Sequence, residues 1–530
     1  MSVPPSVDVL VVGAGPVGLT LAAQLARRGL ACSVIDRAMA RTDKSKALVI
    51  WPRTLELLSA AGQAEPFLAC GVHARGARLF GGTRELAWFD FARARSAYAF
   101  ALMIPQSETE RLLEEQAVAA GAGVERGVEL VRFADAGDRV QATVRGGDGA
   151  EREVAAAWLV GCDGAHSTVR HGLGLEFAGS AENHDWFLAD VQVEGALPRD
   201  EVRIFLHPAG VLAFFPLPPD RFRVIGDLGR ARAEHPPEPA LEDVQVLLDR
   251  RGPGGLRAHD PHWLAGFRIN ERQVPSYGRG RVWLAGDAAH IHSPAGGQGM
   301  NTGMQDAFNL AWKLALVQQG RARPALLDTY EAERRPIGAL TVRLTSAVTR
   351  MGTLRLQVAQ RLRNTLLSNA SALSFVRDLA VNALTETLVH YRSSALSRDA
   401  RAPFARLTSR WRGLWPGDRA PDAALVGASG AVTSVFALLR GSHHLLLLLT
   451  ADVPSASAEL ASAVEAAFPG LVSGAVIGRT AGALRDIDGS LHGLYGVRRP
   501  TAVLVRPDGY IGYIGPPDGA VNHLASYLVR

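Results

Sequence analysis

Apolar runs and amphipathic helical patterns alternate over the first part of the chain. Residues 9–12 form a short apolar run rich in β-branched side chains, as expected of a buried parallel strand. Residues 19–28 follow with apolar positions at helical spacing, Gly29 ends the helix, and residues 32–35 form a second strand. This order is typical of an α/β unit with a parallel sheet.

The pattern changes twice further along the chain. Between residues 181 and 275, apolar and polar side chains mostly alternate between Gly and Pro turns, which predicts an inserted antiparallel sheet. Helical periodicity then dominates residues 324–400, and a Pro/Gly linker precedes a β-α-β-α-β-β-α pattern. We therefore expect α/β and α+β architecture in three parts: residues 1–180 with 276–400, residues 181–275 joined by part of 74–104, and residues 417–530.

The turn after the first strand carries Gly13, Gly15 and Gly18 in the pattern G-x-G-x-x-G, and Asp36 ends the second strand. One glycine permits the tight turn, one lets the backbone approach a pyrophosphate, and one allows helix and strand to pack closely. The helix N-terminus offers free N–H groups to the phosphates, and Asp36 can accept hydrogen bonds from a ribose. The pattern predicts a dinucleotide site; the alternative is a glycine-rich turn in another kind of α/β protein.

Two later stretches place polar residues at strand ends. Asp163 follows a short strand and precedes a helix, where it forms either a second polar site or only a helix N-cap. Another buried strand ends in Gly286-Asp287, and residues 294–301 then form a glycine-rich loop that opens a helix. Such a loop can direct several backbone N–H groups at an anion or a carbonyl, and it has more glycines than a simple connection needs.

Aromatic and histidine side chains in the middle of the chain have two interpretations. Phe205, His207, Phe214 and Phe215 line an aromatic substrate pocket or pack in a core. His207 and His290 are candidate general bases by their chemistry alone, with a structural role as the alternative.

Charge and cysteine content narrow the class of protein. The formal net charge is +5, and arginines greatly outnumber acids between residues 343 and 419. Because these arginines are spread through apolar helical patterns, a solvated face or a subunit contact, as in a homodimer, explains them better than nucleic-acid binding.

The three cysteines form no C-x-x-C pair, and we expect no disulfide framework and no metal site. No charged-then-apolar leader precedes the first strand and no apolar run could span a bilayer, so we expect a cytoplasmic protein.

With these motifs in place, residues 1–400 resemble the single-component FAD-dependent aromatic hydroxylases, which include p-hydroxybenzoate hydroxylase, phenol hydroxylase and polyketide hydroxylases. The resemblance implies a Rossmann-type FAD-binding domain with an inserted substrate-binding sheet. Residues 417–530 resemble the thioredoxin-like domain of phenol hydroxylase, with Pro500 at the place of the thioredoxin-type proline. No cysteine follows Cys162, which excludes thiol–disulfide exchange there and leaves a packing or oligomerisation role.

The resemblance also implies which residues contact FAD. The glycine motif and Asp36 would hold the ADP half, Asp163 would serve both FAD and NAD(P)H, Asp287 the ribityl chain, and residues 294–301 the isoalloxazine ring. Lys46 and Arg53 would neutralise the phosphates, or else be a solvated lysine and a helix-start arginine; many family members carry Arg in place of Lys46. The predicted cofactor-binding set is Gly13, Gly15, Pro16, Val17, Gly18, Asp36, Arg37, Lys46, Arg53, Gln106, Leu130, Asp163, Gly286, Asp287, Pro294, Gly297, Gly299, Met300 and Asn301.

The activity that the resemblance implies is aromatic hydroxylation. FAD, reduced by NADPH or NADH, would form a C4a-hydroperoxide with O₂, and a phenolic or polycyclic ring would take up the distal oxygen. Pro294 is the best candidate for a residue at the reacting ring. The same fold could instead carry out epoxidation or Baeyer–Villiger oxidation, and a non-catalytic FAD-bound protein is the alternative from another class.

Overall fold

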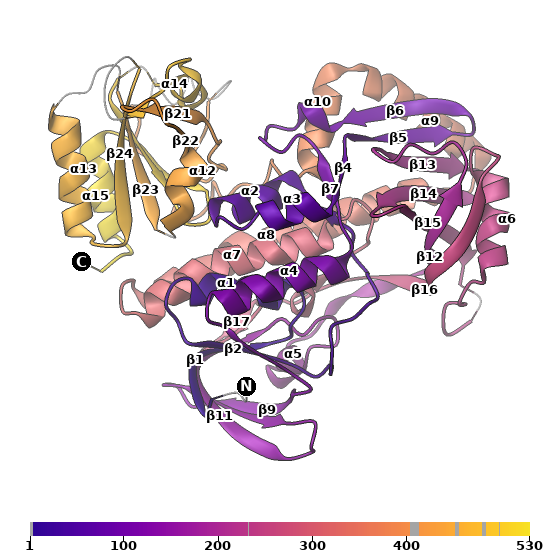
Figure 1. The fold of residues 1–530 in the computed structure, drawn as a ribbon, viewed down its shortest axis with the longest axis horizontal. Helices are drawn as coiled ribbons and strands as arrows, with labels where there is room; N and C mark the ends of the chain where they lie inside the picture. The colour runs from indigo at the N-terminus through magenta and orange to yellow at the C-terminus, as the bar shows by residue number, and fades with distance from the viewer. Residues whose placement is uncertain are drawn as a thin grey trace.

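The structure is a computed structural model that describes residues 4–231, 233–402, 413–441, 443–450, 455–479, 484–497 and 499–529. Helices α7 (Gly299–Gln318) and α8 (Asp328–Gly352) run through the middle of the molecule (Figure 1). One sheet lies below them in this view, a second lies to the right, and the C-terminal elements, drawn in orange and yellow, lie to the upper left (Figure 1). The predicted combination of α/β and α+β architecture is confirmed.

The first sheet is built around β1 (Ser6–Val12), which pairs in parallel with β2 (Cys32–Asp36) and β11 (Glu151–Gly161). The apolar run at residues 9–11 is fully buried, because helices cover a parallel strand and leave it no polar face. After the glycine turn, α1 (Pro16–Ala26) packs against α4 (Gln106–Ala119) and α7. The sheet also holds β8 (Gly123–Arg126), β9 (Glu129–Asp135), β10 (Val140–Arg145), β17 (Gly278–Arg279) and β18 (Val282–Leu284).

The second sheet contains the predicted alternating segment, and most of its strand pairs are antiparallel. Two of its strands come from the earlier 74–104 region, and one of these, β5, pairs in parallel with β13. In order across the sheet the strands are β19 (His290–Ile291), β16 (Arg257–Gln273), β12 (Ala178–Glu194), β15 (Arg221–Arg230), β14 (Gly210–Leu217), β13 (Val202–His207), β5 (Gly76–Gly81) and β6 (Arg84–Asp90).

Helices cover both faces of this second sheet. The segment expected to be all strand contains one helix, α6 (Leu241–Arg251), whose Val244 and Leu248 pack on one face. The carboxylate of Asp243 in its first turn accepts from the N–H of Ala240 at 2.9 Å, which stabilises the helix start. The other face packs against Leu367 of α9 (Gln357–Ala372). The helical periodicity of the sequence therefore predicted α8, α9 and α10 (Ser374–Leu384) correctly, whereas the helical pattern of α6 was overlooked.

Short elements join these parts. A small sheet of β3 (Val49–Ile50), β7 (Ala101–Met103) and β4 (Val72–Ala74) lies beside α2. Helices and 3₁₀ turns here are α2 (Pro52–Ala60), α3 (Glu65–Cys70), η1 (Phe91–Arg93), α5 (Thr168–Gly172), η2 (Gly286–Ala288), η3 (Pro324–Leu326) and α10 (Ser374–Leu384). Within the part of the chain that the structure describes, no helix is both long and apolar enough to cross a bilayer.

The C-terminal part forms a third sheet. The apolar run at residues 444–449 is its central strand, and the predicted hairpin at residues 507–509 joins its last two strands. In order across the sheet the strands are β20 (Arg398–Asp399), β27 (Ile511–Gly515), β26 (Thr501–Val505), β23 (His444–Leu449), β24 (Val472–Gly478), β25 (Leu484–Arg485), β21 (Ala424–Gly427) and β22 (Val432–Ser434). Its helices are α12 (Val435–Leu438), η4 (Leu439–Gly441), α13 (Ser455–Ala467), α14 (Ser490–Tyr495) and α15 (Pro517–Ala525).

A buried charge cluster fastens this third sheet to α7 and α8. Glu333 of α8 accepts from Lys313 of α7 at 2.7 Å and from Arg506 at 2.6 and 2.8 Å. Arg506 also donates to Asp508 at 2.5 Å, and Asp508 accepts from the indole N–H of Trp312 at 3.2 Å. All of these side chains are buried. We call Lys313, Glu333, Arg506 and Asp508 the junction cluster.

Candidate active site

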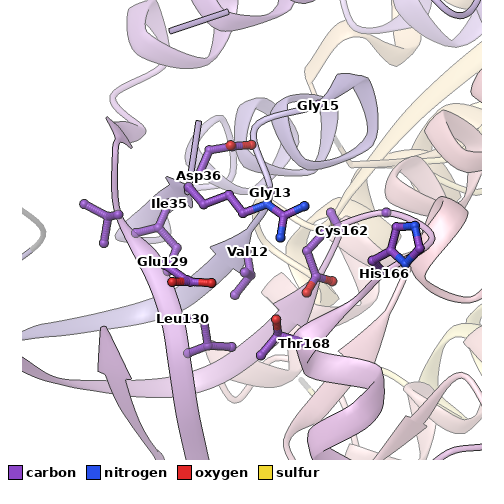
Figure 2. A pocket seen from close by; sticks show the side chains of 14 residues that line it. Val12, Gly13, Gly15, Ile35, Asp36, Glu129, Leu130, Cys162, His166 and Thr168 are labelled. Carbon is purple, nitrogen blue, oxygen red and sulfur yellow. The ribbon is translucent and has the colours of Figure 1, made fainter. Parts of the chain in front are cut away.

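A cavity of about 220 Å³ opens where β1, β2 and β11 end, and we call it the β1 cavity. Figure 2 shows side chains from these strand ends and from the following turns surrounding it. In a parallel sheet this edge is where ligands bind. The cavity is lined by Val12, Gly13, Gly15, Ile35, Asp36, Arg37, Val128, Glu129, Leu130, Cys162, Asp163, Gly164, His166 and Thr168.

The three glycines of the first turn have different surroundings. A Cβ built on Gly13, whose φ is +107°, would overlap the carbonyl oxygen of Cys162, and one on Gly18 would overlap the carbonyl of Gly13. These two positions therefore require glycine so that β1, α1 and β11 can pack closely. A Cβ on Gly15 would meet no atom within 4 Å, because its Cα faces the open space of the cavity. Gly15 is the point at which a ligand can approach the backbone.

Asp36 is held in place at the end of β2. One carboxylate oxygen accepts from the N–H of Ala14 at 2.7 Å, and the other accepts from the N–H of Ala38 at 2.8 Å. Each oxygen keeps a lone pair for a further donor. The carboxylate is thereby oriented at the cavity without being saturated, as acceptance from ribose hydroxyls requires.

Asp163 supplies a polar atom that the protein itself does not satisfy. Its Oδ2 accepts from the N–H of Val169 at 3.2 Å, whereas Oδ1 is buried without a hydrogen-bond partner among the described residues. Burial raises the pKa of this carboxyl group. Buried polar atoms in native proteins are paired, so an orphaned oxygen beside a cavity fits a ligand that brings a hydrogen-bond donor, such as a ribose hydroxyl of FAD or a water bound to its pyrophosphate. The donor and acceptor set of the β1 cavity therefore fits a dinucleotide.

Close backbone packing brings the second glycine stretch beside the first. A Cβ on Gly286 would lie 2.7 Å from Val17 of α1, and one on Gly303 would lie 3.1 Å from the Cα of Gly286. Asp287 follows directly; solvent reaches it, yet the surrounding chain desolvates it enough to raise its pKa, an effect that the charges of His290 and Lys46 oppose. Residues 286–287 therefore lie beside the start of α1, and the charge of Lys46 is close to Asp287, although these segments are far apart in the sequence.

The glycine loop at residues 294–301 is fixed by side chains at its back. The Asn301 side chain accepts from the N–H of Trp51 at 2.8 Å and donates to the carbonyls of Val49 and Gly297, both at 2.9 Å. The indole N–H of Trp51 donates to the carbonyl of Gly296 at 2.9 Å. The amide of Asn301 is thus used by the protein, which leaves the backbone N–H groups at the start of α7 for a ligand.

The side chains of Arg53 and Gln106, which were predicted to contact the phosphates or FAD, bond to other parts of the protein. The guanidinium of Arg53 is buried, donates to Glu56 at 3.2 Å and to the carbonyl of Asp508 at 2.8 Å, and lies 4.5 Å from the ring centroid of Tyr510. The interpretation as a phosphate ligand is corrected: Arg53 joins α2 to the C-terminal hairpin. The Gln106 side chain accepts from the N–H of Ala47 at 2.9 Å and donates to Glu110 at 2.8 Å, so the protein uses both ends of its amide.

The predicted aromatic pocket is divided between the two faces of the second sheet. Phe205 and Phe214 are buried against α6, with ring centroids 5.9 Å apart, which makes them core residues. His207 accepts from the N–H of Ala209 at 3.0 Å, and burial, with Arg251 and Arg250 nearby, lowers its pKa. Only Phe215 lies on the opposite face, in a cluster with Trp51 of the glycine-loop region.

Histidine and glutamate residues near the glycine loop complete the site. His290 is buried, and its Nε2 is bonded to Asp306 at 2.8 Å. Glu386, which the sequence analysis overlooked, is buried at φ +59° and accepts from Thr302 at 3.1 Å and from Gln305. Burial raises the pKa of Glu386 to about 8. Nothing local in the sequence marks this glutamate, because its donors lie more than 80 residues away.

Two family descriptions match the chain. Residues 6–345 match "FAD binding domain", and residues 414–530 match "Aromatic-ring hydroxylase, C-terminal". Among curated proteins, 6-methylpretetramide 4-monooxygenase of Streptomyces rimosus is 38% identical over 98% of this chain and 93% of its own. Pentachlorophenol 4-monooxygenase of Sphingobium chlorophenolicum is 32% identical over 95% of this chain and 93% of its own.

Solved structures agree with this pattern. The anhydrotetracycline hydroxylase OxyS from Streptomyces rimosus superposes with a TM-score of 0.80 and 33% identity, over 98% of this chain and 99% of its own. Aklavinone-11 hydroxylase, solved as a ternary complex with FAD and aklavinone, superposes with a TM-score of 0.77 and 26% identity over 99% of both chains. Both similarities extend across all three sheets described above.

Proposed function

The chain belongs to the FAD-dependent aromatic hydroxylases, and from this premise we propose that it hydroxylates a polycyclic phenol with FAD held between the β1 cavity and the glycine loop. It is a flavin-dependent monooxygenase that uses O₂ and NAD(P)H, as its relatives are. The polycyclic substrate class is supported by relatives named for 6-methylpretetramide and anhydrotetracycline. We favour NADPH as the reductant by the same analogy.

The orphaned Oδ1 of Asp163 beside the glycine turn is the observation that carries the cofactor assignment. In this proposal Gly15 admits the pyrophosphate, Asp36 accepts from the ribose, and the backbone near Leu130 borders the adenine. Residues 286–287 would hold the ribityl chain, and residues 294–301 would border the ring. Bound FAD supplies hydride acceptance and oxygen activation, and the protein supplies position and electrostatics.

Residues behind the glycine loop would position the reacting region. Asn301 and Trp51 fix the loop through four hydrogen bonds, so the backbone N–H groups of Gly299 and Met300 keep their direction when a ligand arrives. These groups lie at the positive end of the α7 dipole, which favours negative charge on the ring edge that they meet. Apolar packing of Trp51 with Phe91, at a centroid distance of 5.4 Å, excludes water behind the loop.

The face of the second sheet opposite α6 would bind the substrate. Trp186 and Phe267 on this face stack with centroids 6.4 Å apart, and the indole N–H of Trp186 is buried without a partner among the described residues. A stacked aromatic surface with one free donor suits a flat ring system bearing oxygen atoms. Phe215 extends this face toward Trp51.

We further propose that residues 1–180 with 276–400 form the FAD-binding domain, that 181–275 with part of 74–104 form the substrate domain, and that 417–530 form the C-terminal domain. The sheet pairings of the three parts support this division. A homodimer would use the arginine-rich helical segment, whose exposed apolar side chains, among them Leu362, Leu366 and Phe375, suit a contact surface.

The purified protein provides the test. We expect a yellow protein with a flavin spectrum that oxidises NADPH faster with polycyclic phenols, and whose product gains one oxygen atom from ¹⁸O₂. The Phe215→Ala variant should raise KM with unchanged flavin content, and Phe214→Ala should lower stability and leave KM unaltered in the folded fraction. A protein without bound flavin, or a Phe214→Ala variant with the larger KM effect, would contradict the assignment.

A further inference from the structure

A second cavity, of about 170 Å³, lies where the first sheet's helices meet the third sheet, and we call it the junction cavity. Arg27 and Arg28 follow the end of α1 and line it from one side, while His443 and Pro507 line it from the other. No Asp or Glu is among its lining residues, which are Arg27, Arg28, Trp312, Ala315, Leu316, Gln319, Gly441, His443, His444, Gly470, Leu471 and Pro507.

The guanidinium of Arg28 is anchored but not saturated. Its Nη1 donates to the carbonyl of Gln24 at 2.7 Å and to the Gln24 side chain at 3.0 Å. Its Nε is buried and has no hydrogen-bond partner in the part of the chain that the structure describes. Neutral partners therefore hold the group in place at the cavity wall while its charge stays uncompensated.

The neighbouring charges do not balance this arginine. Burial lowers the pKa of Arg28 to about 10, and the charge of Arg27 beside it acts in the same direction. Among the described residues, neither arginine has a carboxylate within 4.0 Å; Arg27 donates only to the carbonyl of Arg440, at 3.3 Å. Asp508 is the one acid that favours the charge of Arg28, and Asp508 is already bonded to Arg506, Trp312 and Asn309.

Arg28 is half-buried beside the exposed Arg27, and a partly desolvated charge next to a second cation is costly unless a counter-ion is present. A tetrahedral oxyanion matches the planar fork of an arginine, and it would supply the counter-charge that Arg27 and Arg28 lack among the described residues. His443 is bonded to Ser473 at 2.6 Å and borders the same space. We propose that the junction cavity binds a small oxyanion of the phosphate class, clamped between α1 and the C-terminal part of the chain.

The site lies at the opposite end of α1 from the glycine turn. The anion would therefore tie the helix that begins at the β1 cavity to the third sheet, without contacting the reacting groups. Free phosphate and the terminal phosphate of a nucleotide share this chemistry, and the experiment separates the two sources.

The test is equilibrium dialysis of the full-length, FAD-loaded protein against radiolabelled inorganic phosphate at constant ionic strength set with chloride. We expect one saturable phosphate per chain, and at least a tenfold weaker affinity in Arg28→Gln and in Arg27→Gln. Arg28→Lys keeps the charge with fewer donors and should retain part of the affinity. Competition by ADP at concentrations below those needed for phosphate would identify a nucleotide as the source; competition by phosphate alone would identify the free ion.

The matched control is Arg250→Gln, because α6 also ends in two adjacent arginines and Arg250 is exposed. This variant should bind phosphate as the unaltered protein does. An equal loss of phosphate affinity in Arg250→Gln would overturn the proposal. It would also be overturned if the unaltered protein bound phosphate no more tightly than the folded, flavin-loaded variants Arg27→Gln and Arg28→Gln.

Discussion

The β1 cavity and the junction cluster both contain buried charged groups, but they differ in whether the protein itself pairs those groups. In the β1 cavity, Asp163 keeps one oxygen that has no partner among the described residues. In the junction cluster, both oxygens of Glu333 accept hydrogen bonds. The donors are the charged groups of Lys313 and Arg506, the amide of Asn309 and the hydroxyl of Ser394. A saturated cluster is complete within the protein, whereas an unsaturated one requires a ligand.

The two regions also differ in what the pKa directions mean. Burial alone would raise the pKa of Glu333, but Arg506 and Lys313 lower it, so the carboxylate stays ionised. Burial raises the pKa of Asp163, and hydrogen bonds from Ser167 and from nearby backbone N–H groups oppose this shift only in part. Glu333 therefore contributes to stability, whereas Asp163 is available to a ligand. The following variants separate these two roles.

The largest effect is expected from Glu333→Ala. Removing this carboxylate leaves Lys313 and Arg506 buried without their main counter-charge, which should lower the free energy of unfolding by about 3–5 kcal/mol. Urea unfolding followed by circular dichroism measures it. Glu194→Ala removes an exposed pair with Arg257, which solvent screens, and should cost far less. Similar losses in the two variants would mean that the junction cluster is not special.

Gly13→Ala tests the β1 cavity in the same way. The added Cβ would overlap the Cys162 carbonyl at a φ of +107°, so we expect FAD affinity to fall by about 2 kcal/mol, or roughly thirtyfold. Flavin content after dialysis and fluorescence titration with FAD report it. Gly137→Ala has a φ of +90° with no atom within 4 Å of the new Cβ, and it should retain FAD. Loss of FAD in both variants would show that strain alone is responsible.

Glu386 is an intermediate case, because it has hydrogen-bond donors and no cation bonded to it among the described residues. Its folded-state pKa of about 8 lies above the ordinary value of 4.5, so the folded protein favours the protonated form. The contribution of protonated Glu386 to the free energy of unfolding is therefore complete below about pH 4.5. This contribution is lost as the pH rises toward 8, by at most about 1.4 kcal/mol per pH unit.

We expect Glu386→Gln to flatten this part of the stability curve, measured as urea unfolding at pH 5, 6, 7 and 8. Glu194→Gln, an exposed control, should leave the curve unchanged. A slope that persists in Glu386→Gln would assign it to another group.

The smallest effect is expected from Asp36→Asn. The amide keeps one acceptor for two backbone N–H donors and loses the charge, which should weaken FAD binding by about 1 kcal/mol, or roughly fivefold. Fluorescence titration with FAD measures it, and Asp138→Asn on an exposed turn is the control. An unaltered FAD affinity would mean that Asp36 only shapes the turn.

The nucleotide turn could be predicted from sequence because its determinants are local. Gly13, Gly18 and Asp36 act on backbone within one β-α-β unit, so spacing alone carries the information. Arg53 was misassigned for the opposite reason. Besides the nearby Glu56, it donates to the carbonyl of Asp508, 455 residues away, and nothing near Arg53 indicates that contact.

The substrate face shows a second limit of sequence reasoning. Phe214 and Phe215 are adjacent and point to opposite faces, and only one of them can face the substrate. Alternation of apolar and polar residues identifies a strand. The polarity of its side chains shows which face is buried only when the other face is exposed to solvent. Here α6 covers one face and α9 the other, so both phenylalanines pack in apolar clusters and the sequence cannot distinguish them.

The pairing of β1 has a consequence for how the protein is made. Its neighbour β11 begins at residue 151, β18 at residue 282 and α7 at residue 299. At about 5–20 residues per second, the ribosome needs on the order of tens of seconds after β1 to deliver α7. Before β11 is made, β1 can pair only with β2 and its apolar run is only partly covered, which makes early nascent chains candidates for chaperone capture. FAD would meet a complete binding surface only when more than half of the polypeptide has been synthesised.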